Sequence, residues 1–118
     1  MYAKDLFSWE IYENQGITVV KPLWKEITFK NTKAFHLRMK EFLSDKETPR
    51  IVLDLAAVEI LDSLSLGTLV AISKNVKQKN GEIVIASLSA PIKELFELLN
   101  FNHVFRCFDS AEEAIQNF

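Results

Sequence analysis

The sequence is poor in residues that cross-link or interrupt a chain. It holds a single cysteine, Cys107, so neither an intrachain disulfide nor a Cys-x-x-Cys metal pair can form. This usage suits a reducing compartment, and we expect Cys107 to be a small buried apolar residue. Only three glycines and three prolines occur among 118 residues. No repeat or low-complexity stretch is present, so the linkers should be short.

Long hydrophobic runs are also absent. No stretch approaches the roughly 18 uncharged apolar residues that span a bilayer. The N-terminal sequence MYAKDLFSWE lacks the apolar core of a secretion signal. We therefore expect a cytoplasmic protein with no direct membrane insertion.

An excess of charge of one sign is missing as well. The 14 basic and 16 acidic side chains give a net charge of -2, which offers no electrostatic attraction for a polyanion, so nucleic acid is not expected as a partner. The composition, 48% hydrophobic and 25% charged, is that of an ordinary folded domain. At this length, residues 1–118 should form one domain.

What is present is a hydrophobic period that alternates between strand and helix. WEIYENQGITVVKPLW holds two strand-like runs around Asn14, Gln15 and Gly16, which suit a tight reversal and predict an antiparallel hairpin. Residues 32–44 have a helical period. RIVLDL, residues 50–55, is short, branched and aliphatic, as expected for a strand buried on both faces of a parallel sheet.

The second half of the chain repeats this alternation. Asn80 and Gly81 should end a helix, with Gly81 in the left-handed conformation that favours glycine. The pattern predicts an α/β fold with a mixed, mostly parallel sheet of about five strands, an N-terminal hairpin and about four helices. The elements expected after residue 55 are a helix at 64–79, a strand at 82–87, a helix after Ser89, a strand at 104–108, and a last helix from Asp109 or Ser110.

Two polar residues, Asp62 and Ser63, stand at the start of the helix expected at 64–79. The sequence SLSLG resembles the G-x-S-x-G nucleophile elbow around Ser65, but its first glycine is replaced. The only histidines, His36 and His103, are expected on a helix surface and in a turn, so no base is paired with the serine. Neither a metal-ligand spacing nor a glycine-rich phosphate loop occurs. We therefore expect no enzyme activity, no metal and no cofactor.

Asp62 and Ser63 admit more than one explanation. Either side chain could cap the helix, which is worth about 1 kcal/mol, but capping would explain only one of them. A phosphate on Ser63 would be favoured there by free N–H groups and the helix dipole, and it would add about -1.5 to -2 of charge beside Asp62. A binding face would then become a switched one. Asp54 could form a two-carboxylate site with Asp62, although we favour a structural role in which it accepts backbone N–H groups.

A family resemblance follows from these residues. IVLDLAAVEILDSLSLGTLVAISKNVKQKNGEIVIASL, with APIKELFELLNFNHVFRCFDSAEEAI after it, resembles the STAS domain of bacterial anti-sigma factor antagonists. The central motif of that family reads approximately D-L-S-x-V-x-x-[IL]-D-S-[SAT]-G-L-G. The positions that match it in order are Asp54, Leu55, Val58, Leu61, Asp62, Ser63, Leu66 and Gly67.

The resemblance implies a protein-binding regulator that works by partner switching in signal transduction and transcription. Its partner would be an anti-sigma factor with serine kinase activity, and a PP2C-type phosphatase would reverse the phosphorylation. Ser63 matches the phosphorylated serine. Unphosphorylated protein would bind the anti-sigma kinase and phosphorylated protein would release it. The partner surface implied by the resemblance comprises Asp62, Ser63, Leu64, Ser65 and Gly67, with the turn around Glu26 and Thr28.

The chain departs from the family pattern at several of these positions. Leu64 replaces a residue that is usually small, and Ser65 stands where the family generally has glycine. In KEITFKN, which is similar to the family's G-E-L-D-x-x-N, Lys25 replaces the glycine and Thr28 the aspartate. These departures keep an alternative open, in which the chain is a constitutive STAS scaffold or a transporter-associated subunit that is not phosphorylated.

Overall fold

The computed structural model describes residues 8–118. Residues 1–7, which include most of the N-terminal segment considered above and the first part of the predicted domain, lie outside the described residues. The predicted hairpin is confirmed: β1 (Trp9–Asn14) pairs antiparallel with β2 (Ile17–Pro22). Gln15 and Gly16 join them with φ values of 57° and 78°, the two positive angles that a tight two-residue hairpin turn of type I′ requires.

The hairpin continues into a parallel sheet. β4 (Arg50–Asp54) pairs with β2 on one side and with β6 (Glu82–Ala86) on the other, and β7 (Cys107–Phe108) completes the order β1-β2-β4-β6-β7. Every pair after the hairpin is parallel. The predicted mixed, mostly parallel sheet is therefore confirmed, and β4 is buried at its centre as its apolar sequence indicated.

The last strand is shorter than predicted. Residues 104–108 were expected to be extended, but only Cys107–Phe108 form a strand. The chain before it tightens into a 3₁₀-helix, η2 (Phe101–His103), and Val104 keeps a helical backbone at its end. The apolar residues of this segment pack as a compact turn, with Phe101 and Phe105 both against Phe96.

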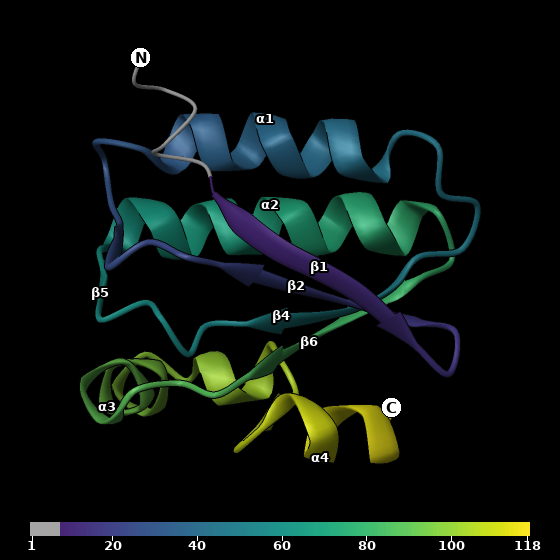
Figure 1. Cartoon of the computed structure of the whole chain (residues 1–118). Helices are drawn as coiled ribbons and strands as arrows, with labels where there is room; N and C mark the ends of the chain where they lie inside the picture. The colour runs from purple at the N-terminus through teal and green to yellow at the C-terminus, as the bar shows by residue number, and fades with distance from the viewer. Residues whose placement is uncertain (1–7) are drawn as a thin grey trace.

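Two layers of helices enclose the sheet (Figure 1). α1 (Thr32–Leu43) and α2 (Ser63–Gln78) lie on one face and α4 (Ala111–Gln116) on the other, and α3 (Ala90–Leu98) adds to the core shared with α1 and α2. Buried side chains of the larger core include Phe35, Leu53, Leu69, Ile85 and Phe96. Those of the smaller core, under α4, include Val19, Val52, Val84, Ala114 and Ile115.

The ends of the two long helices are tied by backbone-directed contacts. Lys79, after the end of α2, donates from Nζ to the carbonyl oxygens of Leu43 at 2.7 Å, Lys46 at 2.9 Å and Ser44 at 3.3 Å. Since the last carbonyls of a helix have no partner inside it, this lysine closes the end of α1.

At the start of α4, the sequence left Asp109 and Ser110 as two options for the capping residue. The structure shows that it is Ser110, whose Oγ accepts from Glu113 N at 3.1 Å.

Helix α2 ends before Gly81 as predicted, but the left-handed conformation predicted for this glycine was wrong. Asn80, with φ of 60°, is the left-handed residue after α2, and Gly81 does not have a positive φ. Glycine is required at 81 because a Cβ there would lie 2.1 Å from the carbonyl oxygen of Pro49, a distance far inside van der Waals contact. The residue therefore permits a close approach of two backbones.

A second, two-stranded sheet was not predicted. β3 (Glu26–Ile27) pairs parallel with β5 (Ile60–Leu61). The contact is extended by Lys25, whose carbonyl oxygen accepts from Glu59 N at 2.7 Å and from Ile60 N at 3.1 Å. This small sheet brings the segment before α1 against the segment before α2, and so positions the residues described next.

Candidate functional site

Asp62 is the N-cap of α2 and also binds a second segment. Its Oδ1 accepts from Ser65 N at 2.9 Å, and its Oδ2 accepts from Phe29 N at 2.8 Å. Partial desolvation by itself would raise the pKa of this carboxyl, but the hydrogen bonds from the Ser65 and Phe29 amides outweigh it, and the pKa is lowered. Asp62 is thus an ionised cap that joins the start of α2 to the turn before α1.

Ser63 is the first residue of α2 and is exposed. Because Asp62 already supplies the cap, the Ser63 hydroxyl is not needed for it. The amides of Ser63 and Leu64 belong to the first turn, where no carbonyl of the helix can accept from them. The two roles that the sequence left undecided are therefore divided: Asp62 caps the helix, and Ser63 presents a hydroxyl to solvent.

The turn between β3 and α1 is held by its own polar groups. Thr28 N donates to Asn31 Oδ1 at 2.8 Å, and Asn31 Nδ2 donates to the carbonyl oxygen of Glu26 at 2.9 Å. The Thr28 hydroxyl donates to Glu26 Oε1 at 2.7 Å. Lys30 lies 3.9 Å from the same carboxylate. These bonds fix the turn in the conformation that aims Phe29 N at Asp62.

The residues predicted for the partner surface do not all reach the surface. Ser63, Leu64 and Gly67 are exposed, and Asp62 and Glu26 are half-buried. The Ser65 side chain is completely buried and that of Thr28 nearly so. Successive side chains of a helix are turned by about 100°, so Ser65 faces the core while Ser63, Leu64 and Gly67 face outward. The Ser65 and Thr28 side chains therefore lie beneath the surface, and the partner contact predicted for them stays a prediction.

Sequence reasoning missed two apolar residues beside Ser63. Phe29, Ile60 and Leu64 are 71%, 53% and 57% exposed, and they come from the three segments that meet at Asp62. We call these three residues the apolar rim. Phe29 had a detectable signal, because a large aromatic side chain between Thr28 and Lys30 in a polar turn has no core to enter. Ile60 had none, since its exposure depends on the unpredicted pairing of β3 with β5.

No histidine is paired with Ser63 in the described chain. His36 lies half-buried on α1, with its pKa lowered by burial and by Lys40, and His103 is exposed at the end of η2. Within residues 8–118, neither histidine has a hydrogen bond or ion pair to Asp62 or Ser63. No group of three His, Cys, Asp or Glu side chains in the same range could hold a metal ion.

Asp54 has the structural role that the sequence favoured, because its Oδ1 accepts a hydrogen bond from Ala56 N at 3.0 Å.

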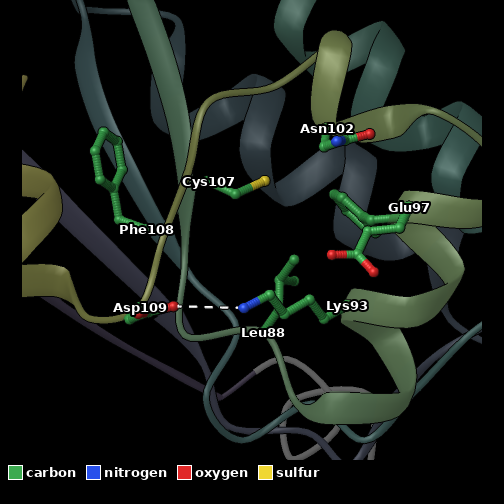
Figure 2. A pocket seen from close by; sticks show the side chains of 8 residues that line it. Leu88, Lys93, Glu97, Asn102, Cys107, Phe108 and Asp109 are labelled. Atoms are coloured by element: carbon green, nitrogen blue, oxygen red, sulfur yellow. Dashed lines mark ion pairs between the residues drawn. The ribbon is translucent and has the colours of Figure 1, made fainter.

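A separate small cavity lies between α3 and β7 (Figure 2). Cys107 lines this cavity and is exposed, so the expectation that this residue is buried was wrong. Partial burial of the thiol nevertheless raises its pKa to about 11, against the opposing effect of Lys93, and a protonated thiol is a poor nucleophile. The cavity holds only about 100 Å³, below the roughly 300 Å³ of small-ligand sites. Lys93 and Asp109 approach each other across it at 3.8 Å.

The fold agrees with comparisons to known proteins. The sequence model of the STAS domain matches residues 8–114. The chain belongs to the STAS domain family. The match covers nearly all described residues and includes both segments of the site. No helix in residues 8–118 of this STAS domain is long and apolar enough to cross a membrane.

Individual relatives are similar along most of the domain. A candidate anti-sigma factor antagonist of Bordetella bronchiseptica, BtrV, is 32% identical over 74 residues, which are 63% of this chain and 64% of that protein. The anti-sigma F factor antagonist of Paenibacillus polymyxa is 23% identical over 106 residues, 90% of each chain. A crystal structure of a candidate anti-sigma factor antagonist from Thermotoga maritima shares the fold with a TM-score of 0.80 at 24% identity, covering 99% and 97% of the two chains.

Proposed function

We propose that this STAS domain is an anti-sigma factor antagonist that binds an anti-sigma factor at the start of α2. The observation that carries the proposal is the exposed hydroxyl of Ser63, on a helix already capped by Asp62 and flanked by the apolar rim. Relatives named as antagonists of this class support it. The partner would cover Ser63, Leu64 and Gly67, with Phe29 and Ile60 as apolar anchors.

We further propose that Ser63 is the phosphorylation site and that the anti-sigma factor is its serine kinase. Phosphoryl transfer to Ser63 Oγ would add about -1.5 to -2 of charge beside the ionised Asp62. Amides at the start of a helix stabilise such an anion while it is solvated. A docked partner would have to desolvate the anion among Phe29, Ile60 and Leu64, which is unfavourable without a paired cation. Phosphorylation therefore disfavours binding and leaves the fold intact, and a PP2C-type phosphatase would restore binding.

The phosphorylation step is tested by intact mass. Protein isolated from its own cells is measured before and after phosphatase treatment, and the modified peptide is sequenced. We expect a phosphate-sized difference that maps to Ser63 and is absent from Ser63→Ala. Ser44→Ala is the matched control, because Ser44 is also exposed but follows the end of α1. A label that persists in Ser63→Ala would refute the assignment.

The switch is tested by binding to the anti-sigma factor encoded in the same genome. Ser63→Asp should weaken capture by about tenfold or more, as expected for an unpaired charge placed in a covered interface. Ser63→Asn has nearly the same size without the charge and should retain most of the affinity. Equal binding by both variants would remove the regulatory role of Ser63.

A second candidate function is favoured by Leu64. This bulky side chain is 57% exposed directly beside Ser63, where the family usually has a small residue, and it narrows access to the hydroxyl. The chain would then be a constitutive STAS scaffold or transporter-associated subunit that binds through the apolar rim and is not phosphorylated. In that case Leu64→Ala weakens partner binding, while Ser63→Asp changes it little and no phosphate is found in cells.

A further inference from the structure

Helix α3 carries an apolar residue that the fold does not use. Ile92 and Phe96 turn inward and are buried, whereas Leu98 is 79% exposed, the highest value among the exposed large apolar side chains of the described residues. Leu98 lies with Pro91 and Leu95 along a shallow hollow on the outer side of the helix. A leucine so exposed contributes nothing to the core of this chain.

Carboxylates edge the same hollow. Glu94 and Glu97 line it, and within residues 8–118 neither lies within ion-pair distance of a cation. Lys93, the basic residue of α3, is paired with Asp109 on the side of the cavity in Figure 2. No basic residue occupies the last turn of α3, where the helix dipole is negative and acids are unfavourable. Glu97 also lines the cavity in Figure 2, one turn after Lys93, without forming an ion pair with it. This end of α3 is therefore apolar, and its two carboxylates have no ion pair within residues 8–118.

We infer that this α3 face, made of Pro91, Glu94, Leu95, Glu97 and Leu98, binds a basic amphipathic helix of a protein partner. An apolar side chain of that helix would enter the hollow against Leu95 and Leu98. Its Lys or Arg side chains would meet Glu94 and Glu97 and the negative end of the dipole. Charge complementarity selects this occupant over a second copy of the chain, because a two-fold contact would bring the same carboxylates of both copies together.

The α3 face goes beyond the proposed function and does not depend on Ser63. It lies at the same end of the molecule as the apolar rim, since α3 contacts β5, the strand that carries Ile60. One partner could therefore engage both surfaces, and two separate binding contacts on one molecule multiply their effects. The phosphate proposed at Ser63 would then weaken one contact while leaving the other in place.

The test uses the full chain, labelled with ¹⁵N, and a synthetic amphipathic helix built of leucine and lysine. We expect amide shift changes concentrated in residues 92–99 and saturable binding. A peptide of the same length with glutamate in place of lysine should bind at least about tenfold more weakly. Shift changes centred on β1, α1 or α4, or equal binding of the two peptides, would overturn the inference.

Variants locate the binding energy. Glu94→Lys combined with Glu97→Lys should raise the Kd for the lysine peptide by about tenfold or more. Glu41→Lys with Glu47→Lys changes the net charge equally on exposed positions elsewhere and should have a small effect. Equal effects of the two pairs would mean non-specific attraction and would refute the site.

A second comparison isolates the apolar contact. Leu98→Ala should weaken binding, and Leu37→Ala, at another exposed leucine on α1, should not. Sedimentation of the unliganded chain should show no self-association through α3, and a dimer lost in Leu98→Ala would identify a second copy as the occupant instead. Peptide binding that survives in Ser63→Asp would separate the α3 face from the switch, so that either proposal can fail alone.

Discussion

Asp62→Ala tests whether one carboxylate holds the site together. The substitution removes the cap of α2, worth about 1 kcal/mol, and the acceptor for Phe29 N, worth about 0.5–1.5 kcal/mol because that contact is exposed. The free energy of unfolding at pH 7 should therefore fall by about 1.5–2.5 kcal/mol, or the Tm by about 6–10 °C for a chain of this size. Urea denaturation monitored by circular dichroism measures the change.

The same variant has a predicted pH dependence. The pKa of Asp62 in the folded protein is lower than its ordinary value of 3.8, so the stabilisation is complete above that value and is lost as the pH falls through the folded pKa. The difference between wild type and Asp62→Ala should consequently be smaller at pH 3 than at pH 7. Ser63→Ala, which removes an exposed hydroxyl outside the cap, should change stability by no more than about 0.5 kcal/mol. A loss for Asp62→Ala that is no larger than this control would refute the reasoning.

Three further predictions use the same denaturation assay. Gly81→Ala should destabilise the protein by at least about 2 kcal/mol, because the new Cβ would overlap the carbonyl oxygen of Pro49; wild-type stability would contradict the close approach. Gly67→Ala should instead stabilise it by about 0.5–1 kcal/mol, since nothing lies within 4 Å of a Cβ at that helical position; a loss would mean that the position is crowded. Lys79→Met should cost about 1–2 kcal/mol by removing the donor to the carbonyl oxygens of Leu43, Ser44 and Lys46 at and after the end of α1, and the exposed Lys74→Met should not, so equal values would remove the role of Lys79.

The fold was predictable where the signal is local. Helical periods gave α1 and α2 to within one residue at each end, and the turn chemistry of Gln15 and Gly16 gave the hairpin. The pairing of β3 with β5 was not predictable, because each strand has two residues and the bonds join positions more than 30 residues apart. The short β7 follows from packing of Phe101 and Phe105 on Phe96, which competes with the extended form that the composition favours.

The site was predictable as a stretch of sequence but not as a surface. The motif from Asp62 to Gly67 is continuous in sequence, and the predicted partner surface therefore included Ser65 as though every residue of the motif were exposed. The turn of the helix sends Ser65 into the core. Phe29, in contrast, lies 33 positions before Asp62 and enters the site only through a hydrogen bond from its amide. A residue so distant in the chain can be assigned to the site only from the folded structure.

Because the hydrogen bond between Phe29 N and Asp62 joins distant parts of the chain, it decides which assays can detect a binding partner. The apolar rim, proposed above as part of the partner surface, is discontinuous, because Phe29 is far in the chain from Ile60 and Leu64. Immobilised linear peptides covering 58–78 would display Leu64 and Ile60 without Phe29 and without a fixed helix start. Peptide arrays should therefore miss a binding protein that the intact domain captures, and a binding protein of this kind would discriminate folded from unfolded copies.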